Sequence, residues 1–462
     1  MGDSAQSERF KNLKNSVAGD IIFPGGDTYD QARQVWNAMI DKHPAAIVQC
    51  ANTQDVVRTV EFARDADLRL AVRGGGHNIA GSALCDGGIV ADLSRMKAVM
   101  VDPSKRHAAV EGGATLGDFD TATQAHGLAV PLGINSTTGV AGLTLGGGLG
   151  WLSRKHGMTV DSLQSAHVVT ASGAVLRAST DEHPDLFWAI RGGGGNFGVV
   201  TRFEFKLHAV GPELLCGLIV YPLAQAGAVL RQYRDFIAQA PDELAVWFLM
   251  RKAPPLPFLP PAAHGAGIIA LGLLYAGPPE DGGHLIEPLR RFGTPLGEHV
   301  GVMPYVSWQK AFDPLLAPRA RNYWKSHNLI ELSDDLFDTL VGYAETLPSP
   351  QSEIFVGALG GATCRPSPDA MAYAHRDMRF VLNVHSRWDA PDDDARCVAW
   401  ARDFFQATTP FAGTGVYVNF MTADETDRIR TAYGRNYDRL AEIKRHYDPG
   451  NLFSTNQNIA PA

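Results

Sequence analysis

The chain contains the run VRGGGHNIAG at residues 72–81. Three consecutive glycines let the backbone adopt positive φ and approach a ligand closely, and the amide N–H groups of such a loop converge on an anion such as a pyrophosphate. Arg73 adds a positive charge beside the glycines, and His77 follows them at once. Taken alone, this run is more typical of a glycine-rich turn that carries a solvated histidine. Its surroundings therefore have to decide between a ligand loop and a simple turn.

The residues before this run predict an α+β unit. Apolar spacing predicts an amphipathic helix over residues 29–43, a short buried strand over 45–50 and a second helix over 56–67. A strand over 70–72 then runs directly into the glycines. A strand, a helix and a strand that end in a loop of this kind are typical of a nucleotide-binding unit.

A second glycine-rich run, PLGINSTTGVAGLTLGGGLGW, occupies residues 131–151. It mixes glycines with small hydroxyl residues, which offer exposed amides and short side-chain donors to a long polar ligand. We expect the two runs to form opposite walls of one elongated cofactor groove. The alternative is that these glycines only allow a sheet and a helix to pack closely.

Dinucleotide fingerprints are not supported by the glycine runs. The pattern GxGxxG fails at Ile79 and at Trp151, where a third glycine is required. A third run, residues 193–198, fits the pattern formally, but it leads into an alternating strand over 199–205 rather than into a helix. A Rossmann domain and a nicotinamide cofactor are therefore disfavoured.

Composition sets the broad class of the protein. The 462 residues are 45% hydrophobic and 19% charged, with a formal net charge of −8. This charge disfavours nucleic acid or an anionic membrane as a main partner, because both select clustered Lys and Arg. The five cysteines are spread along the chain without a CxxC spacing, so neither a disulfide framework nor a metal site is expected.

The amino terminus and the apolar runs bear on location. The first nine residues are polar and charged, which does not fit a secretory signal. No apolar run approaches the roughly 20 residues needed to span a bilayer. We therefore expect a cytoplasmic protein.

The character of the sequence changes near residue 210. Alternating strands over 245–250, 267–275 and 378–384 are interleaved with helices over 334–346 and 393–406. This pattern predicts a second domain at about 210–412, an antiparallel sheet covered by helices. A charged helix over 425–447 follows and stops at Asp448-Pro449-Gly450.

Four motifs together carry a resemblance to a known family. They are the loop from Arg73 to His77, the run 133–151, the segment LFWAIRGGGGNFGVVT at 186–201, and the carboxyl-terminal NYDRL at 436–440 followed by YDP at 447–449. In this order and over nearly the whole chain, they resemble the berberine bridge enzyme-like FAD-linked oxidases, which belong to the vanillyl alcohol oxidase (PCMH) type of flavoproteins. The chain is similar to the bacterial branch that includes 6-hydroxy-D-nicotine oxidase.

The resemblance implies the domain layout and the cofactor. A PCMH-type FAD-binding domain would comprise residues 1–209, with its core at about 40–210, and the terminal segment 413–462. The substrate domain, 210–412, would be inserted over the flavin ring. The resemblance also implies that His77 bonds covalently to the flavin 8-methyl carbon. Many relatives add a cysteinyl bond at the position of Asn135, so a single covalent link is expected here.

The FAD-binding residues expected from the two glycine runs and the resemblance are Arg73, Gly74, Gly75, Gly76, His77, Asn78, Gly81, Gly133, Asn135, Thr137, Thr138, Gly139, Gly142, Gly146, Gly147, Gly150, Val200 and Asn456.

The candidate catalytic residues lie in the second half of the chain. Residues 417–420 resemble a strand on which Tyr417 and Asn419 share a face, because side chains two apart on a strand point the same way. In related sugar oxidases a tyrosine in this context resembles the catalytic base, and a core tyrosine with a satisfied hydroxyl is the alternative. Glu353, which opens a strand, and Lys325, which would be either in the cavity or solvated, are weaker candidates.

The resulting hypothesis is an FAD-dependent oxidase that removes hydride from a secondary alcohol or hemiacetal carbon of a small metabolite and passes the electrons to dioxygen, giving hydrogen peroxide. Two alternatives stay open. One is oxidation of a C–N bond or oxidative ring formation, and the other is a flavin-binding protein without turnover. The substrate, the electron acceptor and the oligomeric state are left open by the sequence.

Overall fold

The first glycine loop follows a strand of a four-stranded sheet in the computed structural model, which describes residues 10–462. The expectation for residues 1–9 lies outside the described residues. The strand order is β1 (Asp20–Ile22), β2 (Ala46–Gln49), β4 (Ile89–Asp92) and β3 (Leu70–Arg73), and β2, β4 and β3 are parallel. Helix α3 (Thr53–Asp65) packs on β4, and the Asn52 side chain caps it by accepting a hydrogen bond of 3.0 Å from the Asp55 amide.

A five-stranded antiparallel sheet completes the first half of the chain. Its order is β5 (Val99–Asp102), β6 (His107–Glu111), β10 (Val199–Lys206), β8 (Leu163–Val169) and β9 (Val175–Ser179). A small pair joins β7 (Leu128–Ala129) to β11 (His208–Ala209). The helices of this half are α2 (Tyr29–Ala32), α4 (Leu116–Gln124), α5 (Val140–Leu145), α6 (Ser153–His156) and α7 (Pro184–Ile190).

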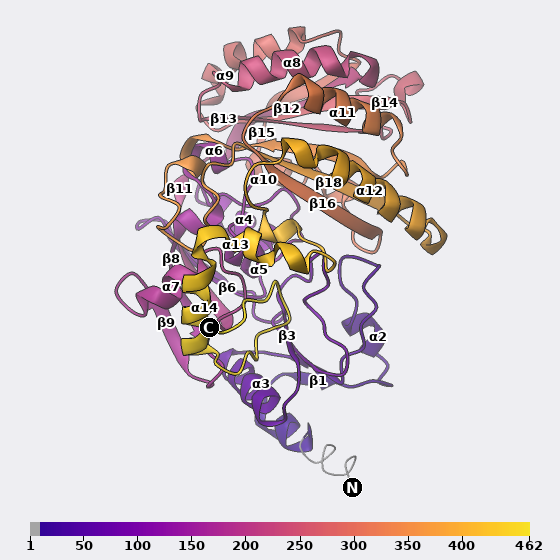
Figure 1. Cartoon of the computed structure of the whole chain (residues 1–462). Coiled ribbons are helices and arrows are strands. Elements are labelled where there is room, and N and C mark those ends of the chain that lie inside the picture. The colour runs from indigo at the N-terminus through magenta and orange to yellow at the C-terminus, as the bar shows by residue number, and fades with distance from the viewer. Residues whose placement is uncertain (1–9) are drawn as a thin grey trace.

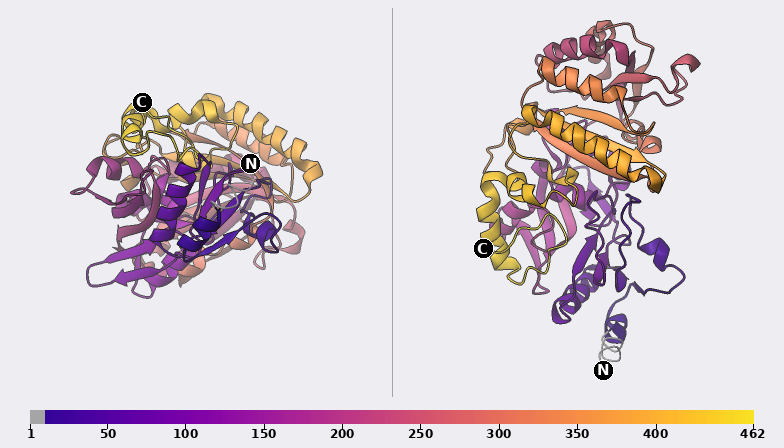
Figure 2. Two further views of the ribbon diagram at one scale, coloured as in Figure 1. Left: turned by 90° about the horizontal axis from the view of Figure 1, so that it is seen from below. Right: turned by 45° about the vertical axis from the view of Figure 1, so that its right-hand side comes forward.

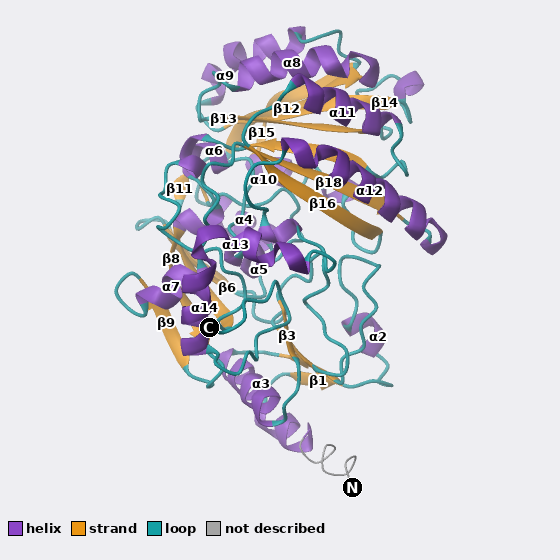
Figure 3. Ribbon diagram, viewed as in Figure 1, coloured by secondary structure: helices purple, strands orange, loops and turns teal. Residues whose placement is uncertain are grey.

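A seven-stranded sheet dominates the second half. Its order is β15 (Gly297–Pro304), β12 (Glu213–Pro222), β14 (Gly267–Tyr275), β13 (Leu244–Lys252), β17 (Glu353–Ala358), β18 (Phe380–Trp388) and β16 (Arg321–Leu329). Every neighbouring pair is antiparallel. The helices of this half are α8 (Ala226–Ile237), α9 (Pro279–Ile286), α10 (Tyr305–Gln309), α11 (Asp334–Glu345) and α12 (Asp394–Thr408). Figures 1 and 3 show α8, α9, α11 and α12 on the outer side of this sheet, away from the first half.

The carboxyl-terminal segment returns to the first half of the chain. Helix α14 (Tyr437–Tyr447) packs against α7, and Leu440 and Ile443 share one hydrophobic core with Phe203 of β10. Both views of Figure 2 show this yellow segment beside the purple and magenta first half. The predicted α+β class and the large antiparallel sheet are confirmed, whereas the exact domain boundaries stay predictions.

Two predicted helices are wrong in extent. The helix expected over 29–43 is only α2, because Trp36 and Asn37 leave it to reach the second half. Trp36 Nε1 donates to the Leu316 carbonyl at 2.9 Å, and Asn37 Nδ2 donates to the Asn322 carbonyl at 3.0 Å. The continuous helix expected over 425–447 is broken into α13 (Ile429–Tyr433) and α14, with Gly434 at a φ of +53° between them.

No helix in the described part of the chain is long and apolar enough to cross a membrane. All five cysteines are free thiols. Within residues 10–462, no group of three or more His, Cys, Asp or Glu side chains is arranged to hold a metal ion.

Candidate active site

A cavity lies between the glycine loops of the first half and the inner face of the seven-stranded sheet. It is lined by the loop after β3, the second glycine run, strands β13, β16, β17 and β18, and parts of the carboxyl-terminal segment. The sequence-predicted residues in its lining are Gly74, Gly75, Gly76, His77, Asn78, Gly133, Asn135, Thr138, Gly139, Gly142, Gly146, Val200, Glu353, Tyr417, Asn419 and Asn456. The structure thus brings most of the predicted site together from segments far apart in the sequence.

The two glycine runs touch each other instead of facing each other across a groove. A Cβ placed on Gly75 would lie 2.3 Å from the backbone nitrogen of Gly139, and one placed on Gly74 would lie 3.7 Å from the Cβ of Ala141. Any side chain at Gly75 would therefore push the loops apart. At this point the loops form one continuous wall, which corrects the expectation of opposite walls.

Five predicted cofactor contacts do not line the cavity. The Arg73 guanidinium donates a hydrogen bond to the Ala32 carbonyl, so its charge is directed to the chain itself. Close packing explains Gly150, where a Cβ would lie 1.7 Å from the Leu132 carbonyl oxygen, and Gly81, where it would lie 2.7 Å from Ile40. Gly147 adopts a φ of +120°, a backbone conformation that favours glycine. The hydroxyl group of Thr137 hydrogen-bonds to His77 instead of lining the cavity.

His77 is held by an aromatic ring and two hydroxyl groups. Its ring stacks on Trp36 with the centroids 5.2 Å apart. Nε2 lies 2.8 Å from the Thr137 hydroxyl, and Nδ1 lies 3.4 Å from the Thr138 hydroxyl. Burial lowers the pKa of the imidazole to about 3. His77 is therefore neutral at physiological pH, which preserves a nucleophilic nitrogen lone pair.

The Tyr417 hydroxyl is the centre of a small hydrogen-bond network. Its oxygen accepts bonds from the Gly148 amide and from Asn419 Nδ2, each at 3.0 Å. Asn419 Nδ2 also donates to the Leu143 carbonyl at 3.1 Å. Burial raises the pKa of Tyr417 to about 12, although both donors act in the opposite direction. The neutral phenol is therefore the form present at neutral pH, and its proton is free for a third partner.

The backbone around Tyr417 differs from the predicted strand. Residues Val418–Phe420 form a 3-10 turn, and Tyr417 itself is the extended residue that precedes it. The alternation on which the strand prediction relied is therefore wrong. Tyr417 and Asn419 still meet, because the tight turn brings the amide group of Asn419 back to the phenol oxygen.

Four side chains on the inner face of the large sheet form a row across four strands. The register pairs Trp324 with His385, His385 with Glu353, and Glu353 with Arg251. Arg251 Nη1 lies 2.8 Å from Glu353 Oε2, and His385 Nδ1 lies 2.9 Å from Glu353 Oε1. All four residues line the cavity.

The carboxylate of Glu353 is ionised and compensated. Burial alone would raise its pKa, but the Arg251 charge and the His385 hydrogen bond outweigh burial and lower it to about 2. Among the cavity residues in the described part of the chain, Glu353 is the one carboxylate. Arg251 neutralises its charge, so the side of the cavity formed by the sheet carries an ion pair of zero net charge and no unpaired carboxylate.

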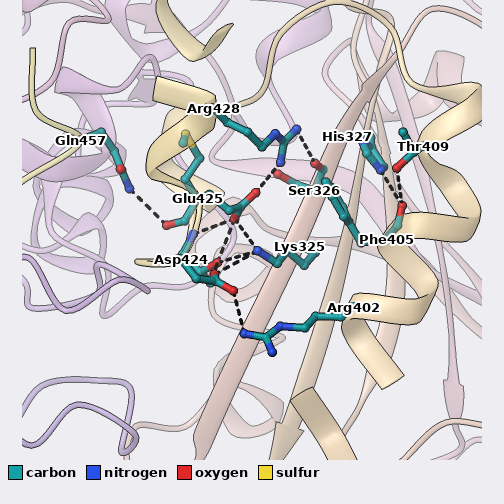
Figure 4. A network of polar contacts seen from close by, with 12 residues as sticks. Lys325, Ser326, His327, Arg402, Phe405, Thr409, Asp424, Glu425, Arg428 and Gln457 are labelled. Atoms are coloured by element: carbon teal, nitrogen blue, oxygen red, sulfur yellow. Dashed lines mark hydrogen bonds and ion pairs between the residues drawn. The ribbon is translucent and has the colours of Figure 1, made fainter. Parts of the chain in front are cut away.

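Lys325 lies on the other face of the sheet. It is the neighbour of Trp324 on β16, and alternation along the strand turns it away from the cavity. Figure 4 shows its ammonium group between Asp424, at 3.0 Å, and Glu425, at 3.3 Å. Lys325 is therefore neither a cavity residue nor solvated, and both interpretations of the sequence are corrected. It fastens β16 to the segment that follows Tyr417.

Several cavity residues were missed from the sequence. Gly194 and Gly195 lie in the third glycine run, and in the segment 186–201 that contains it only Val200 is predicted to contact the cofactor. Thr455 and Gln457 flank the predicted Asn456. His385 falls one residue beyond the strand expected at 378–384 and carries no motif. Only its pairing with β17 reveals it.

Comparison with known proteins identifies the family. The model described as "FAD binding domain" matches residues 44–179, and the one described as "Berberine and berberine like" matches residues 416–460. An FAD-linked oxidoreductase of Dictyostelium discoideum is 32% identical over 452 residues, which is 96% of this chain and 95% of that protein. The chain belongs to the berberine bridge enzyme-like family of FAD-linked oxidoreductases.

Solved structures of related proteins agree with this fold over nearly the whole chain. The 6-hydroxy-D-nicotine oxidase of Arthrobacter nicotinovorans is 27% identical, with a TM-score of 0.87 over 97% of this chain and 99% of that one. A xylooligosaccharide oxidase of Myceliophthora thermophila C1, solved with xylobiose, is 26% identical, with a TM-score of 0.84 over 98% and 99% of the two chains. The fold is therefore the PCMH and berberine bridge enzyme type, with an FAD-binding domain and a large antiparallel sheet domain.

The cavity residues fit FAD, the cofactor of a berberine bridge enzyme-like oxidoreductase. Gly74, Gly75 and Gly139 line the cavity with backbone atoms alone, because glycine has no side chain. Asn456 Oδ1 is buried at the cavity and has no hydrogen-bond partner in the described part of the chain, so it is available to a donor group of the cofactor. The first half of the chain and the carboxyl-terminal segment would hold the cofactor against the sheet.

Proposed function

We propose that this protein is an FAD-dependent oxidase that oxidises a carbon–hydroxyl bond, in a secondary alcohol or a hemiacetal, of an uncharged small molecule. When bound, FAD would supply the hydride acceptor and transfer the electrons to dioxygen, giving hydrogen peroxide. The observation that carries the proposal is the single cavity in which His77 and the glycine loops share a space with Tyr417, His385 and the closed Arg251–Glu353 pair.

The substrate class follows from the charges at the sheet side. An amine is mostly a cation at neutral pH, and a site that selects a cation would present an unpaired carboxylate. Here Arg251 already neutralises Glu353. One solved relative is named for an amine and the other for a sugar, and their sequence identities to this chain, 27% and 26%, are nearly equal. Sequence identity therefore does not distinguish the two substrate classes. The compensated carboxylate therefore favours the neutral alcohol over the amine.

Tyr417 would orient a ligand by hydrogen bonding. Its oxygen already accepts two bonds, and its pKa of about 12 keeps the proton in place. The phenol can therefore donate to an oxygen or nitrogen atom in the cavity. The role of catalytic base, which the sequence predicts for Tyr417, requires loss of this proton and stays a competing prediction.

We also propose that FAD is attached covalently through His77 alone. The Thr137 hydroxyl donates to Asn135 Oδ1 at 2.7 Å, so its oxygen receives the hydrogen of His77 Nε2. Nδ1 then keeps its lone pair and would bond to the flavin 8-methyl carbon in place of one hydrogen. That hydrogen would leave as a proton, and the two electrons of its C–H bond would pass to the flavin ring and then to dioxygen. The side chain at position 135 is an amide rather than a thiol, which leaves no second attachment there.

Covalent attachment is tested by denaturing the purified protein in acid and looking for flavin fluorescence in the band on a gel. Wild type is expected to fluoresce, and His77→Ala is expected to lose the signal. A dark band from yellow wild-type protein would refute the covalent link while leaving FAD binding intact.

The reaction class is tested by mixing the oxidised protein anaerobically with 1-phenylethanol, cellobiose and N-methylbenzylamine. We expect an alcohol or the sugar to bleach the visible flavin band, and peroxide to appear when oxygen is readmitted. Bleaching by the amine alone would establish C–N oxidation instead. No bleaching by any member of a broad alcohol and amine panel would favour a flavoprotein without turnover.

A further inference from the structure

We propose that His385 takes the hydroxyl proton of the substrate during oxidation, and that Glu353 and Arg251 position its imidazole for that step. The inference rests on the proposed function, because it assigns the proton acceptor for the same alcohol oxidation. The side chains of Trp324, His385, Glu353 and Arg251 form a row across β16, β18, β17 and β13, and no sequence motif connects them.

The proton on His385 is placed by Glu353. A carboxylate with a pKa of about 2 is ionised at neutral pH and can only accept a hydrogen bond. Because Glu353 Oε1 lies 2.9 Å from Nδ1, the neutral imidazole carries its hydrogen on Nδ1. Nε2 is then the atom with the free lone pair. This is the arrangement by which a carboxylate selects the tautomer of a general-base histidine.

The imidazole ring of His385 is held in place by stacking, but its Nε2 atom has no hydrogen-bond partner within residues 10–462. It stacks on Trp324 with the centroids 4.5 Å apart and the planes at 21°, and on Phe355 at 6.1 Å and 19°. His385 is 8% exposed, lines the cavity, and its Nε2 atom has no hydrogen-bond partner in the described residues. A buried polar atom without a partner at a ligand cavity is expected to find that partner in the ligand.

Arg251 completes the positioning. Its guanidinium bonds the second oxygen of Glu353 at 2.8 Å, so the carboxylate cannot rotate away from His385. Arg387, two residues along β18 from His385, also lowers the pKa of Glu353. Trp324 and Phe355, which stack on the imidazole, are uncharged. The environment therefore tolerates a transient imidazolium, because Glu353 faces it directly.

The proposed step balances in atoms and electrons. The O–H bond of the substrate breaks, and its proton goes to Nε2 of His385. The C–H bond of the same carbon would break, and its hydride, with both electrons, would go to FAD when FAD is bound. A carbonyl would form in the product, and dioxygen would be the oxidant that removes the two electrons from the cofactor.

Tyr417 is the competing proton acceptor, and it borders the cavity at a different place. Tyr417 contacts Phe420 with the ring centroids 4.8 Å apart, Phe420 contacts Trp324 at 5.6 Å, and Trp324 stacks on His385. Phe420 and Trp324 thus connect the ring of Tyr417 to the imidazole. Replacing each residue singly distinguishes which of the two is the base.

The kinetic experiment measures the anaerobic rate of flavin reduction by 1-phenylethanol, or by cellobiose if that probe reduces the wild type faster, across pH. Loss of a general base typically lowers the rate by about 100-fold or more. If Nε2 takes the proton, the wild-type rate is expected to fall at low pH, and His385→Gln is expected to show a loss of that size with no such fall. Glu353→Gln should slow the reaction and move that fall to lower pH, because the imidazolium loses its counter-charge. His299→Gln, an exposed histidine of β15, is the matched control.

The outcomes separate this inference from the proposed function. A His385→Gln variant with full flavin content, a rate within about threefold of wild type and an unchanged pH profile overturns the role of His385. A Tyr417→Phe variant that alone loses the pH dependence assigns the base to Tyr417. Wild-type flavin that no alcohol or sugar reduces overturns the proposed function and this inference with it.

A second readout does not depend on turnover. Nitrogen NMR of protein labelled at histidine reports which ring nitrogen carries the hydrogen, and the signal of His385 is assigned by its loss in His385→Gln. We expect the Nδ1–H tautomer in wild type and its loss or mixing in Glu353→Gln. A wild-type His385 that carries its hydrogen on Nε2 would contradict the proposal, whatever the kinetics.

Discussion

His77 Nε2 lies 2.8 Å from the Thr137 hydroxyl, which in turn lies 2.7 Å from Asn135 Oδ1. This short chain has a direction, because the amide oxygen can only accept. The hydroxyl therefore donates to Asn135 and accepts from His77, and the imidazole is held with Nδ1 unprotonated. Asn135 therefore acts on the tautomer of His77 through the Thr137 hydroxyl.

The first prediction concerns this chain of hydrogen bonds. Thr137→Val removes the acceptor of the Nε2 hydrogen, so the ring is free to adopt the other tautomer and lose its nucleophilic Nδ1. We expect the fraction of covalently attached flavin to fall several-fold while total flavin changes little. Gel fluorescence divided by total released flavin measures it. Thr121→Val, an exposed threonine of α4, is the control, and an unchanged covalent fraction in Thr137→Val would contradict the tautomer argument.

The parts of the fold that the sequence predicts well are those governed by local patterns. Strands such as β14 (Gly267–Tyr275) and helices such as α11 (Asp334–Glu345) match their predicted extents to within a residue, because the apolar spacing is regular. The helix expected over 29–43 fails because Trp36 bonds to a carbonyl about 280 positions away. A single sequence contains no signal for a contact of that range.

In the candidate site, too, residues in local motifs are predicted from the sequence, whereas residues placed by long-range contacts are not. The glycine loops, His77 and Tyr417 are found from local motifs and from the family resemblance. Lys325 and Glu353 are equally weak candidates in the sequence, but they lie on opposite faces of the large sheet. Lys325 therefore pairs with Asp424, whereas Glu353 lines the cavity. His385 has no motif at all. Its importance appears only when the register of three strands places it between Trp324 and Glu353.

The second prediction concerns the buried ion pair. Arg251→Met leaves the Glu353 carboxylate buried without its cation, and breaking such a pair typically costs ~3–5 kcal/mol of unfolding free energy. Urea unfolding at neutral pH measures the loss. Arg251→Met combined with Glu353→Met removes both charges and should recover a large part of it. A single variant as stable as wild type would show that the carboxylate is compensated by another group.

The pH dependence of stability has a definite sign for this pair. The pKa of Glu353 in the folded protein, about 2, lies below its ordinary value of 4.5, so the carboxylate binds its proton more weakly when folded. Its contribution to stability is therefore full above about pH 4.5 and is lost as the pH falls toward about 2. The double variant should lack this component in the same window, which urea midpoints at several acidic pH values would detect.

The last prediction concerns the contact between the glycine loops. Gly75→Ala adds a methyl group 2.3 Å from the backbone nitrogen of Gly139, a distance that real side chains do not reach, and both partners are backbone segments that cannot rotate aside. The loops must separate, so we expect purified Gly75→Ala to contain little flavin although the large sheet, which the substitution does not touch, stays folded. The ratio of visible flavin absorbance to protein absorbance measures the loss, and circular dichroism monitors the fold. Gly283→Ala in α9, where a Cβ meets nothing within 4 Å, is the matched control. A Gly75→Ala protein with wild-type flavin content would mean that the wall formed by the two loops does not hold the cofactor.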